Sequence, residues 1–121
     1  MKRKRFKVPI YNFNITFIEM ESATDCHLVA KEMKRLNCTP KAICSVSEAL
    51  KNGDVNGGET YRNMPIKEIL VLIYPCTSER RRREVVNHEK RHIEDRILEY
   101  LGINDIEASA YLAGFLSEYI F

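Results

Sequence analysis

Residues 69–74 read Ile69-Leu70-Val71-Leu72-Ile73-Tyr74, a continuous apolar run that Pro75 ends. A run of four to eight apolar residues bounded by a turn residue is typical of a strand. Proline has no backbone N–H and does not extend the ladder. We therefore predict a strand over 69–74, and the segments on either side of it complete the fold.

Two helices are predicted after this strand. The first covers about 79–101, because Ser78 can cap its start and Gly102 stands just past its end. The second runs from about 105 to the C-terminus, with Asn104 as its cap. Its apolar stripe comprises Ala108, Leu112, Phe115, Leu116 and Tyr119. A stripe at this spacing packs on a core.

The segments before the strand predict the other half of the domain. Residues 6–19 alternate apolar and polar side chains, which indicates one half-buried strand, or two strands broken near Pro9. Capping signals at 22–25 and at Thr39-Pro40 begin two short helices, and 53–65 is a loop-rich stretch with a short strand at 59–62. The predicted order is β-α-α-β-β-α-α, a single α+β domain over 1–121 with a small mixed sheet.

The composition fits one globular domain: 121 residues, 45% hydrophobic and 30% charged. No apolar run reaches the length of a transmembrane helix, and the polar residues after the basic start exclude a signal-peptide core. We therefore expect a cytoplasmic protein without a membrane partner. The four cysteines form no CxxC pair and are expected as reduced thiols. A zinc site from Cys26, His27, Cys38 and Cys44 is an alternative, although its spacings match no common zinc knuckle.

The motif that carries chemistry lies in the helix predicted over 79–101. His88-Glu89-Lys90-Arg91-His92 is an H-E-x-x-H sequence. Residues four apart share one helix face, so both imidazoles can bind one Zn²⁺. Glu89 is then placed as a general base that takes a proton from the water that zinc activates.

A catalytic zinc site requires a third protein ligand, and we predict Glu107 for this role. A sharp reversal at Gly102-Ile103-Asn104 would fold the last helix back beside the motif. Glu107 could instead complete a capping box with Asn104. Asp95 competes as a ligand, although it is well spaced to pair with Arg91. His88 and His92 could also be plain residues of a charged, solvated helix face.

Basic residues cluster in two places, at 2–5 and at 80–83. The second cluster, Arg80-Arg81-Arg82-Arg83, opposes the helix dipole at the start of its helix. Three interpretations follow: an acidic protein partner, nucleic-acid phosphates, or pairing with Glu79 and Glu84 on a solvated face. Because no aromatic residue lies among the arginines, nucleic-acid binding is only weakly supported.

The chain resembles the zincin metallopeptidases, specifically the glutamate-liganded (gluzincin) branch. The matching segments are the strand at 69–74, the H-E-x-x-H helix and Glu107-Ala108-Ser109-Ala110-Tyr111. The last of these is similar to the E-A-x-x-F/Y opening of the Glu helix in small intracellular peptidases related to the ImmA/IrrE group. The whole chain is similar to small zincin-like proteins encoded by phages and mobile elements of Bacteroides-type bacteria.

This resemblance implies that His88, His92 and Glu107 are zinc ligands and that Glu89 is the general base. It also implies that the 69–74 strand is the sheet edge that pairs with an extended peptide. Tyr111 or Tyr74 would donate a hydrogen bond to the developing oxyanion. The charged residues at 90, 91 and 94 depart from the family pattern, so metal binding is better supported than proteolysis.

Three functional hypotheses follow from the sequence. The first is a zinc metallopeptidase in which Glu89 activates water for attack on a peptide or amide carbonyl of a peptide or protein substrate. The second is a metal-binding but non-catalytic accessory protein of a phage or mobile element. The third is a small nucleic-acid-binding protein that acts through the arginines at 80–83.

Overall fold

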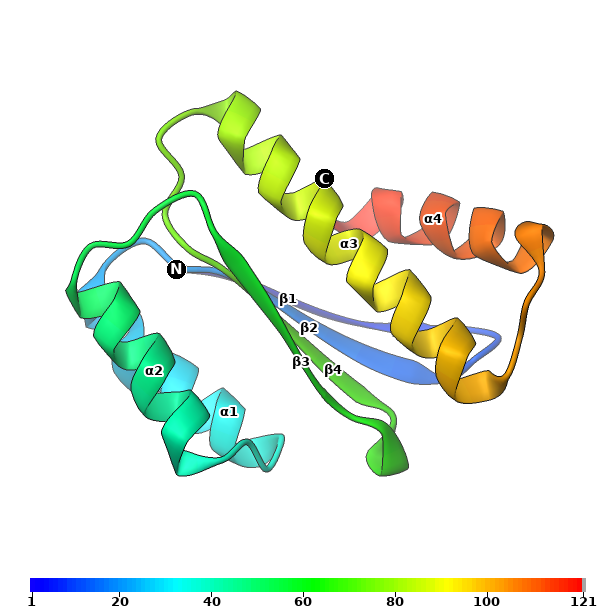
Figure 1. The fold of residues 1–121 in the computed structure, drawn as a ribbon, viewed down its shortest axis with the longest axis horizontal. Coiled ribbons are helices and arrows are strands. Elements are labelled where there is room, and N and C mark those ends of the chain that lie inside the picture. The colour runs from blue at the N-terminus through cyan, green and yellow to red at the C-terminus, as the bar shows by residue number, and fades with distance from the viewer. Residues whose placement is uncertain (121) are drawn as a thin grey trace.

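A computed structural model describes residues 1–120 as a four-stranded sheet between two pairs of helices (Figure 1). The elements in chain order are β1 (Lys2–Val8), β2 (Phe13–Glu19), α1 (Cys26–Arg35), α2 (Pro40–Lys51), β3 (Gly58–Asn63), β4 (Glu68–Ile73), α3 (Glu79–Leu101) and α4 (Ile106–Ile120). Short 3-10 turns occupy Ala23–Asp25 and Met64–Ile66. No described helix is long and apolar enough to cross a membrane.

The sheet is mixed, with strand order β1-β2-β4-β3. The central strands β2 and β4 run parallel, so that Ile15 pairs with Ile69, and each carries an antiparallel edge strand. All six residues of β4 are buried, which is why its sequence is apolar without alternation. The α+β class and the mixed sheet are therefore confirmed.

The N-terminal segment forms two strands with the break at Pro9, as one of the two predicted alternatives had it, whereas the predicted element order counted a single strand. The chain reverses between Val8 and Phe13, and Asn12 takes a left-handed φ of 59° while its N–H donates to the Val8 carbonyl. The basic residues 2–5 extend β1, because lysine and arginine are well tolerated on an edge strand whose side chains reach solvent. The observed order is β-β-α-α-β-β-α-α.

Helix boundaries follow the capping signals in the sequence. Ser78 Oγ accepts the N–H of Arg81 at 3.1 Å, and Gly102 ends α3 in the left-handed region at φ 69°. Thr39 Oγ1 likewise accepts the N–H of Ala42 at 3.1 Å, with Pro40 as the first helical residue of α2. Both helices therefore begin where the sequence predicts.

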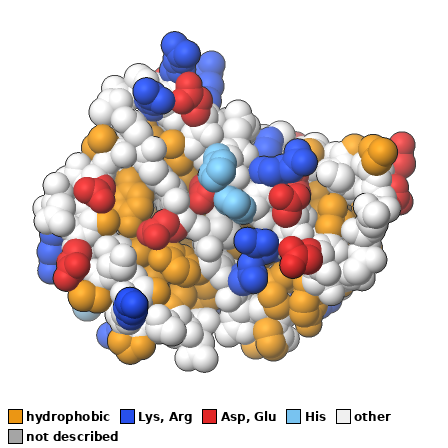
Figure 2. Space-filling model, in the orientation of Figure 1, with side chains coloured by type: hydrophobic (Ala, Val, Ile, Leu, Met, Phe, Trp, Pro, Cys, Tyr) orange, Lys and Arg blue, Asp and Glu red, His pale blue; other side chains and the backbone are white. Residues whose placement is uncertain are grey.

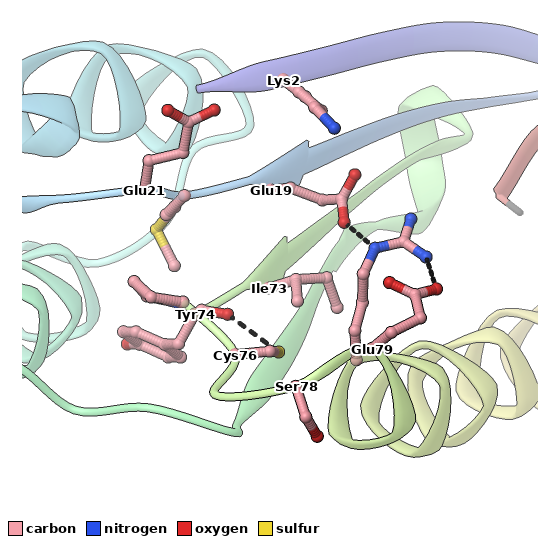
Figure 3. A pocket seen from close by; sticks show the side chains of 11 residues that line it. Lys2, Glu19, Glu21, Ile73, Tyr74, Cys76, Ser78 and Glu79 are labelled. Carbon is pink, nitrogen blue, oxygen red and sulfur yellow. Dashed lines mark hydrogen bonds and ion pairs between the residues drawn. The ribbon is translucent and has the colours of Figure 1, made fainter.

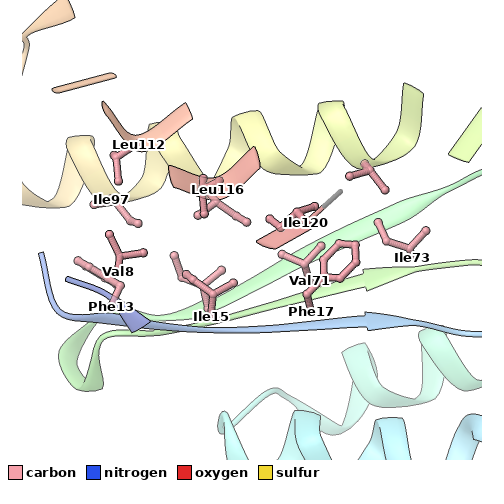
Figure 4. Close-up of a cluster of buried hydrophobic side chains, with 13 residues drawn as sticks. Val8, Phe13, Ile15, Phe17, Val71, Ile73, Ile97, Leu112, Leu116 and Ile120 are labelled. Atoms are coloured by element: carbon pink, nitrogen blue, oxygen red, sulfur yellow. The ribbon is translucent and has the colours of Figure 1, made fainter. Parts of the chain in front are cut away.

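Two buried apolar clusters hold the layers together, one on each face of the sheet. Alternate residues of β2 and β4 point to α3 and α4, where they pack in the larger cluster (Figure 4). That cluster comprises Val8, Phe13, Ile15, Phe17, Ile69, Val71, Ile73, Val86, Ile93, Ile97, Leu112, Leu116 and Ile120. The opposite face packs on α1 and α2. The sheet is thus fixed from both sides.

A buried carboxylate ties three strands to α1. Glu68 is 8% exposed and receives the guanidinium groups of Arg5 at 2.7 Å and Arg35 at 3.2 Å. Arg5 also donates to Thr16 Oγ1 at 2.8 Å. Burial alone would raise the pKa of Glu68, but hydrogen bonds and charges from the two arginines outweigh it and hold the pKa below its usual range.

Replacement of Glu68 by Gln is expected to lower the free energy of unfolding by about 2 kcal/mol at neutral pH, because the charged hydrogen bonds from Arg5 and Arg35 lose their ionised partner. Since folding lowers the pKa of Glu68, its stabilisation is present above the unfolded-state pKa of about 4.3 and is lost as the pH falls through the folded-state pKa. Urea unfolding of both proteins from neutral to acid pH tests this. A stability difference that stays constant into the acid range would contradict it.

Candidate metal centre

The H-E-x-x-H motif lies in the middle of α3, on the flank that faces the edge strand β3 (Figure 2). The two Nε2 atoms of His88 and His92 converge to 3.1 Å, and their rings are perpendicular. His88 is exposed and His92 is half-buried, whereas Glu89 beneath them is only 3% exposed. The helix therefore presents two imidazoles above a buried carboxylate.

Glu89 is buried because α3 approaches β3 closely at Gly58. A Cβ atom at position 58 would lie 2.8 Å from Glu89 Cγ and 3.1 Å from Val85 Cγ1, so only glycine leaves room for the glutamate. Burial raises the pKa of Glu89, against the opposing influence of His92, His88 and the Thr60 hydroxyl. Neither Glu89 Oε2 nor Thr60 Oγ1 completes a hydrogen bond within the described residues.

The geometry of these side chains fits a zinc ion. One ligand atom from each of His88, Glu89 and His92 lies within 4.8 Å of the others, and no other group of three such residues occurs within 1–120. Tetrahedral zinc with bonds of 2.0–2.1 Å places two nitrogen ligands about 3.3 Å apart, close to the observed Nε2 separation. The same separation also suits a hydrogen bond between two neutral imidazoles.

Glu107 is not brought to this cluster. It is exposed in the first turn of α4, where its backbone N–H donates to Asp105 Oδ1 at 2.9 Å. Helix α4 packs on the flank of α3 that carries Lys90 and Glu94, and that flank is turned away from the histidines. A side chain on α4 therefore lies on the opposite flank of α3 from His88 and His92.

The predicted oxyanion donors also lie elsewhere. Tyr111 packs edge-on against Tyr11 at the β1–β2 reversal, and it stacks on Phe115. Tyr74 belongs to the cluster on the opposite face of the sheet and donates to Glu59 Oε2 at 2.8 Å. His27, Cys26, Cys38 and Cys44 form no metal-binding group, and all four cysteines of the chain are free thiols.

The free sheet edge beside the motif is β3, whereas the sequence assigned that role to 69–74. β4 lies between β2 and β3, so both of its edges are already paired. On the β3 side, the Tyr74 N–H donates to the Gly57 carbonyl. On the β2 side, the Met20 N–H donates to the Ile73 carbonyl, and the Asn14 N–H donates to the carbonyl of Lys67, just before β4. These bonds determine which residues of β3 bond to β4 through their backbone. The bonded residues are Glu59, Tyr61 and Asn63. The backbone N–H and C=O groups of the residues between them point to the free edge, and these residues are Gly58, Thr60 and Arg62.

Two surface hollows of similar size lie near this region, and neither includes the histidines. One, of about 640 Å³, lies at the start of β3 and is lined by Asp54, Gly58, Glu59 and Tyr74 among others. The other, of about 630 Å³, lies at the carboxyl ends of β2 and β4, where Arg82 of α3 bridges Glu19 and Glu79 (Figure 3). The first adjoins the free edge and is therefore the one relevant to the motif.

All four arginines of the second basic cluster form ion pairs within the chain. Arg80 and Arg81 pair with Glu84, Arg83 pairs with Glu79, and Arg82 pairs with both Glu19 and Glu79. The exposed pairs neutralise much of the local charge, as expected for a solvated helix face. These contacts add no support to an acidic or nucleic-acid partner.

Gly58 and Thr60 are the residues of the site that the sequence did not reveal as such. The only available signal was the Gly57-Gly58 pair, which reads as a loop in isolation. No protein-family model, no curated protein and no solved structure matches this chain. The functional interpretation therefore rests on the geometry of the chain itself.

The substitution Gly58→Ala is expected to destabilise the fold by about 1–3 kcal/mol, because the new methyl group overlaps Glu89 and must push α3 from β3. Gly114→Ala in α4 is the matched control. A Cβ there meets nothing within 4 Å, and alanine is the better helix former by up to about 1 kcal/mol. Urea unfolding should give opposite signs for the two changes. Equal effects would show that α3 does not depend on glycine at position 58.

Proposed function

We propose that this protein is a zinc-dependent hydrolase that acts on an extended peptide segment laid along β3. The observation that carries the proposal is the buried Glu89 carboxylate, which lacks a hydrogen-bond partner for Oε2 and lies beneath two converging imidazoles. An unpaired buried carboxylate is costly unless a ligand or a reaction uses it. Its place beside a free strand edge supports a role in chemistry on a bound chain.

His88 and His92 would hold the metal through their Nε2 atoms. When bound, zinc would activate a water molecule and polarise the carbonyl under attack. Catalytic zinc sites usually have three protein ligands, and this cluster offers two imidazoles as ligands, with its one carboxylate assigned to the general base. Glu107, on the other flank of α3, is the less favoured third ligand, so zinc content should be insensitive to its removal.

Glu89 would serve as the general base. Its burial raises the pKa of the carboxyl group toward the working pH, which suits a group that accepts a proton and later returns it. Thr60, across the narrow gap, favours the ionised form and keeps the carboxylate available. The outward N–H and C=O groups of Gly58 and Thr60 would hold the main chain of the substrate next to this carboxylate.

Zinc content tests the metal assignment. Wild-type protein is expected to retain about one zinc per chain, since two imidazoles four residues apart on one helix face can bind the same ion. The variants His88→Ala and His92→Ala should lose it, and Glu107→Gln should keep it. Elemental mass spectrometry of dialysed protein measures all four. Zinc-free wild-type protein after zinc is added back would leave the two imidazoles as a hydrogen-bonded pair.

Glu89→Gln separates catalysis from binding. The variant should keep its zinc and lose hydrolysis of an unstructured protein substrate by a factor of about 10²–10⁴, the usual contribution of a general base. Removal of the buried charge should leave the fold stable. If zinc and hydrolysis both survive, Glu89 is not the base. If zinc binds and wild type hydrolyses nothing, the non-catalytic metal-binding alternative is favoured.

A further inference from the structure

The free edge of β3 carries opposite charges at its two ends. At its start, the hollow beside Gly58 contains the carboxylates of Glu59 and Asp54, and no lysine or arginine lines it. Tyr74 hydrogen-bonds to Glu59 at 2.8 Å, and burial together with that carboxylate raises the pKa of the Tyr74 phenol. The phenol therefore stays neutral and adds no charge of its own to the hollow.

The far end of β3 is basic on the side that faces α3. A Cβ atom at Gly58 would point to Glu89, as the Thr60 side chain does, so Arg62, two residues further on, lies on that same face. Strand β3 and helix α3 run in the same direction from this contact (Figure 1). Arg62 is exposed and forms no ion pair within residues 1–120.

The alternation of a strand determines which side chains of a bound peptide meet these charges. A peptide residue opposite Glu59 directs its side chain toward the acidic hollow, on the α2 side of the sheet. A residue opposite Arg62 directs its side chain to the α3 side, next to Arg62. Antiparallel pairing is the more stable arrangement per residue, and it reverses the order of the two positions in the peptide.

We propose that the substrate is an extended peptide in which an acidic residue precedes a basic residue by three positions, the acidic side chain lying against Arg62 and the basic one entering the hollow of Glu59. This specificity rests on the proposed function, because it assumes that a peptide occupies the β3 edge. Arg62 and the two carboxylates would fix both the register and the direction of the chain across Glu89.

Binding of three labelled peptides to full-length Glu89→Gln protein tests the inference without requiring turnover. The peptides have neutral flanks and the cores Glu-Ala-Ala-Lys, Lys-Ala-Ala-Glu and Gln-Ala-Ala-Gln. Fluorescence anisotropy should show the first core binding about fivefold more tightly than the other two, as expected for a pair of partly exposed ion pairs. The preference should weaken at high salt.

Matched variants assign the preference to its residues. Glu59→Gln, which can still accept from Tyr74, should remove the contribution of the peptide lysine, and Arg62→Gln should remove that of the peptide glutamate. Glu118→Gln, on the exposed surface of α4, is the control and should leave the preference intact. Equal binding of all three peptides, tighter binding of the reversed core, or a preference that survives both variants would overturn the inference.

Failure of this inference is distinguishable from failure of the proposed function. Hydrolysis of the uncharged peptide by zinc-loaded wild-type protein, with no effect of charge order, would overturn only the specificity. Charge-ordered binding by a protein that retains no zinc would overturn the hydrolase and keep β3 as a peptide-binding edge.

Discussion

At Gly58 the edge strand and helix α3 come closer than any larger residue would allow, and the geometry of the motif follows from that contact. Because the helix lies so near the strand, Glu89 is buried between them while His88 and His92, further round the helix, stay at the surface. A wider gap would let water reach the carboxylate and lower its pKa toward the value of a free glutamate. The absence of a Cβ atom at position 58 is thus the reason that Glu89 is buried and not exposed to water.

Helix α3 buries two carboxylates, and their surroundings differ. Glu94 is 4% exposed on the α4 flank; its Oε1 also lacks a hydrogen-bond partner and burial raises its pKa, but Lys90 and Arg91 favour its ionised form. Glu89 has instead two imidazoles and a hydroxyl nearby, and no lysine or arginine compensates its charge. Buried acids without a cation are expensive to keep and are found where a ligand supplies the missing charge. The contrast within one helix is the best physical reason to regard the β3 flank as the functional one.

The sequence predicted those parts of the fold that depend on local signals. The apolar run at 69–74, the cap at Ser78 and the stop at Gly102 each act through neighbouring residues, and each is found as expected. β1 was missed because its Lys-Arg pattern has no apolar alternation. The strand order could not be read locally, so β4 was placed at the edge that β3 occupies. Glu107 depends on which flank of α3 receives α4, and a turn of a few residues does not specify that choice.

The parallel pairing of β2 with β4 has a consequence for how the protein acquires its site. The β1–β2 hairpin and the α3–α4 hairpin join neighbouring segments and can form quickly, whereas β2 and β4 come from opposite halves of the chain. Closing that long loop is entropically slow, whereas β3, β4 and α3 follow one another along the chain and need no such closure to meet. The gap between Gly58 and Glu89 therefore depends on contacts among β3, β4 and α3, which can shield the base before β2 pairs with β4.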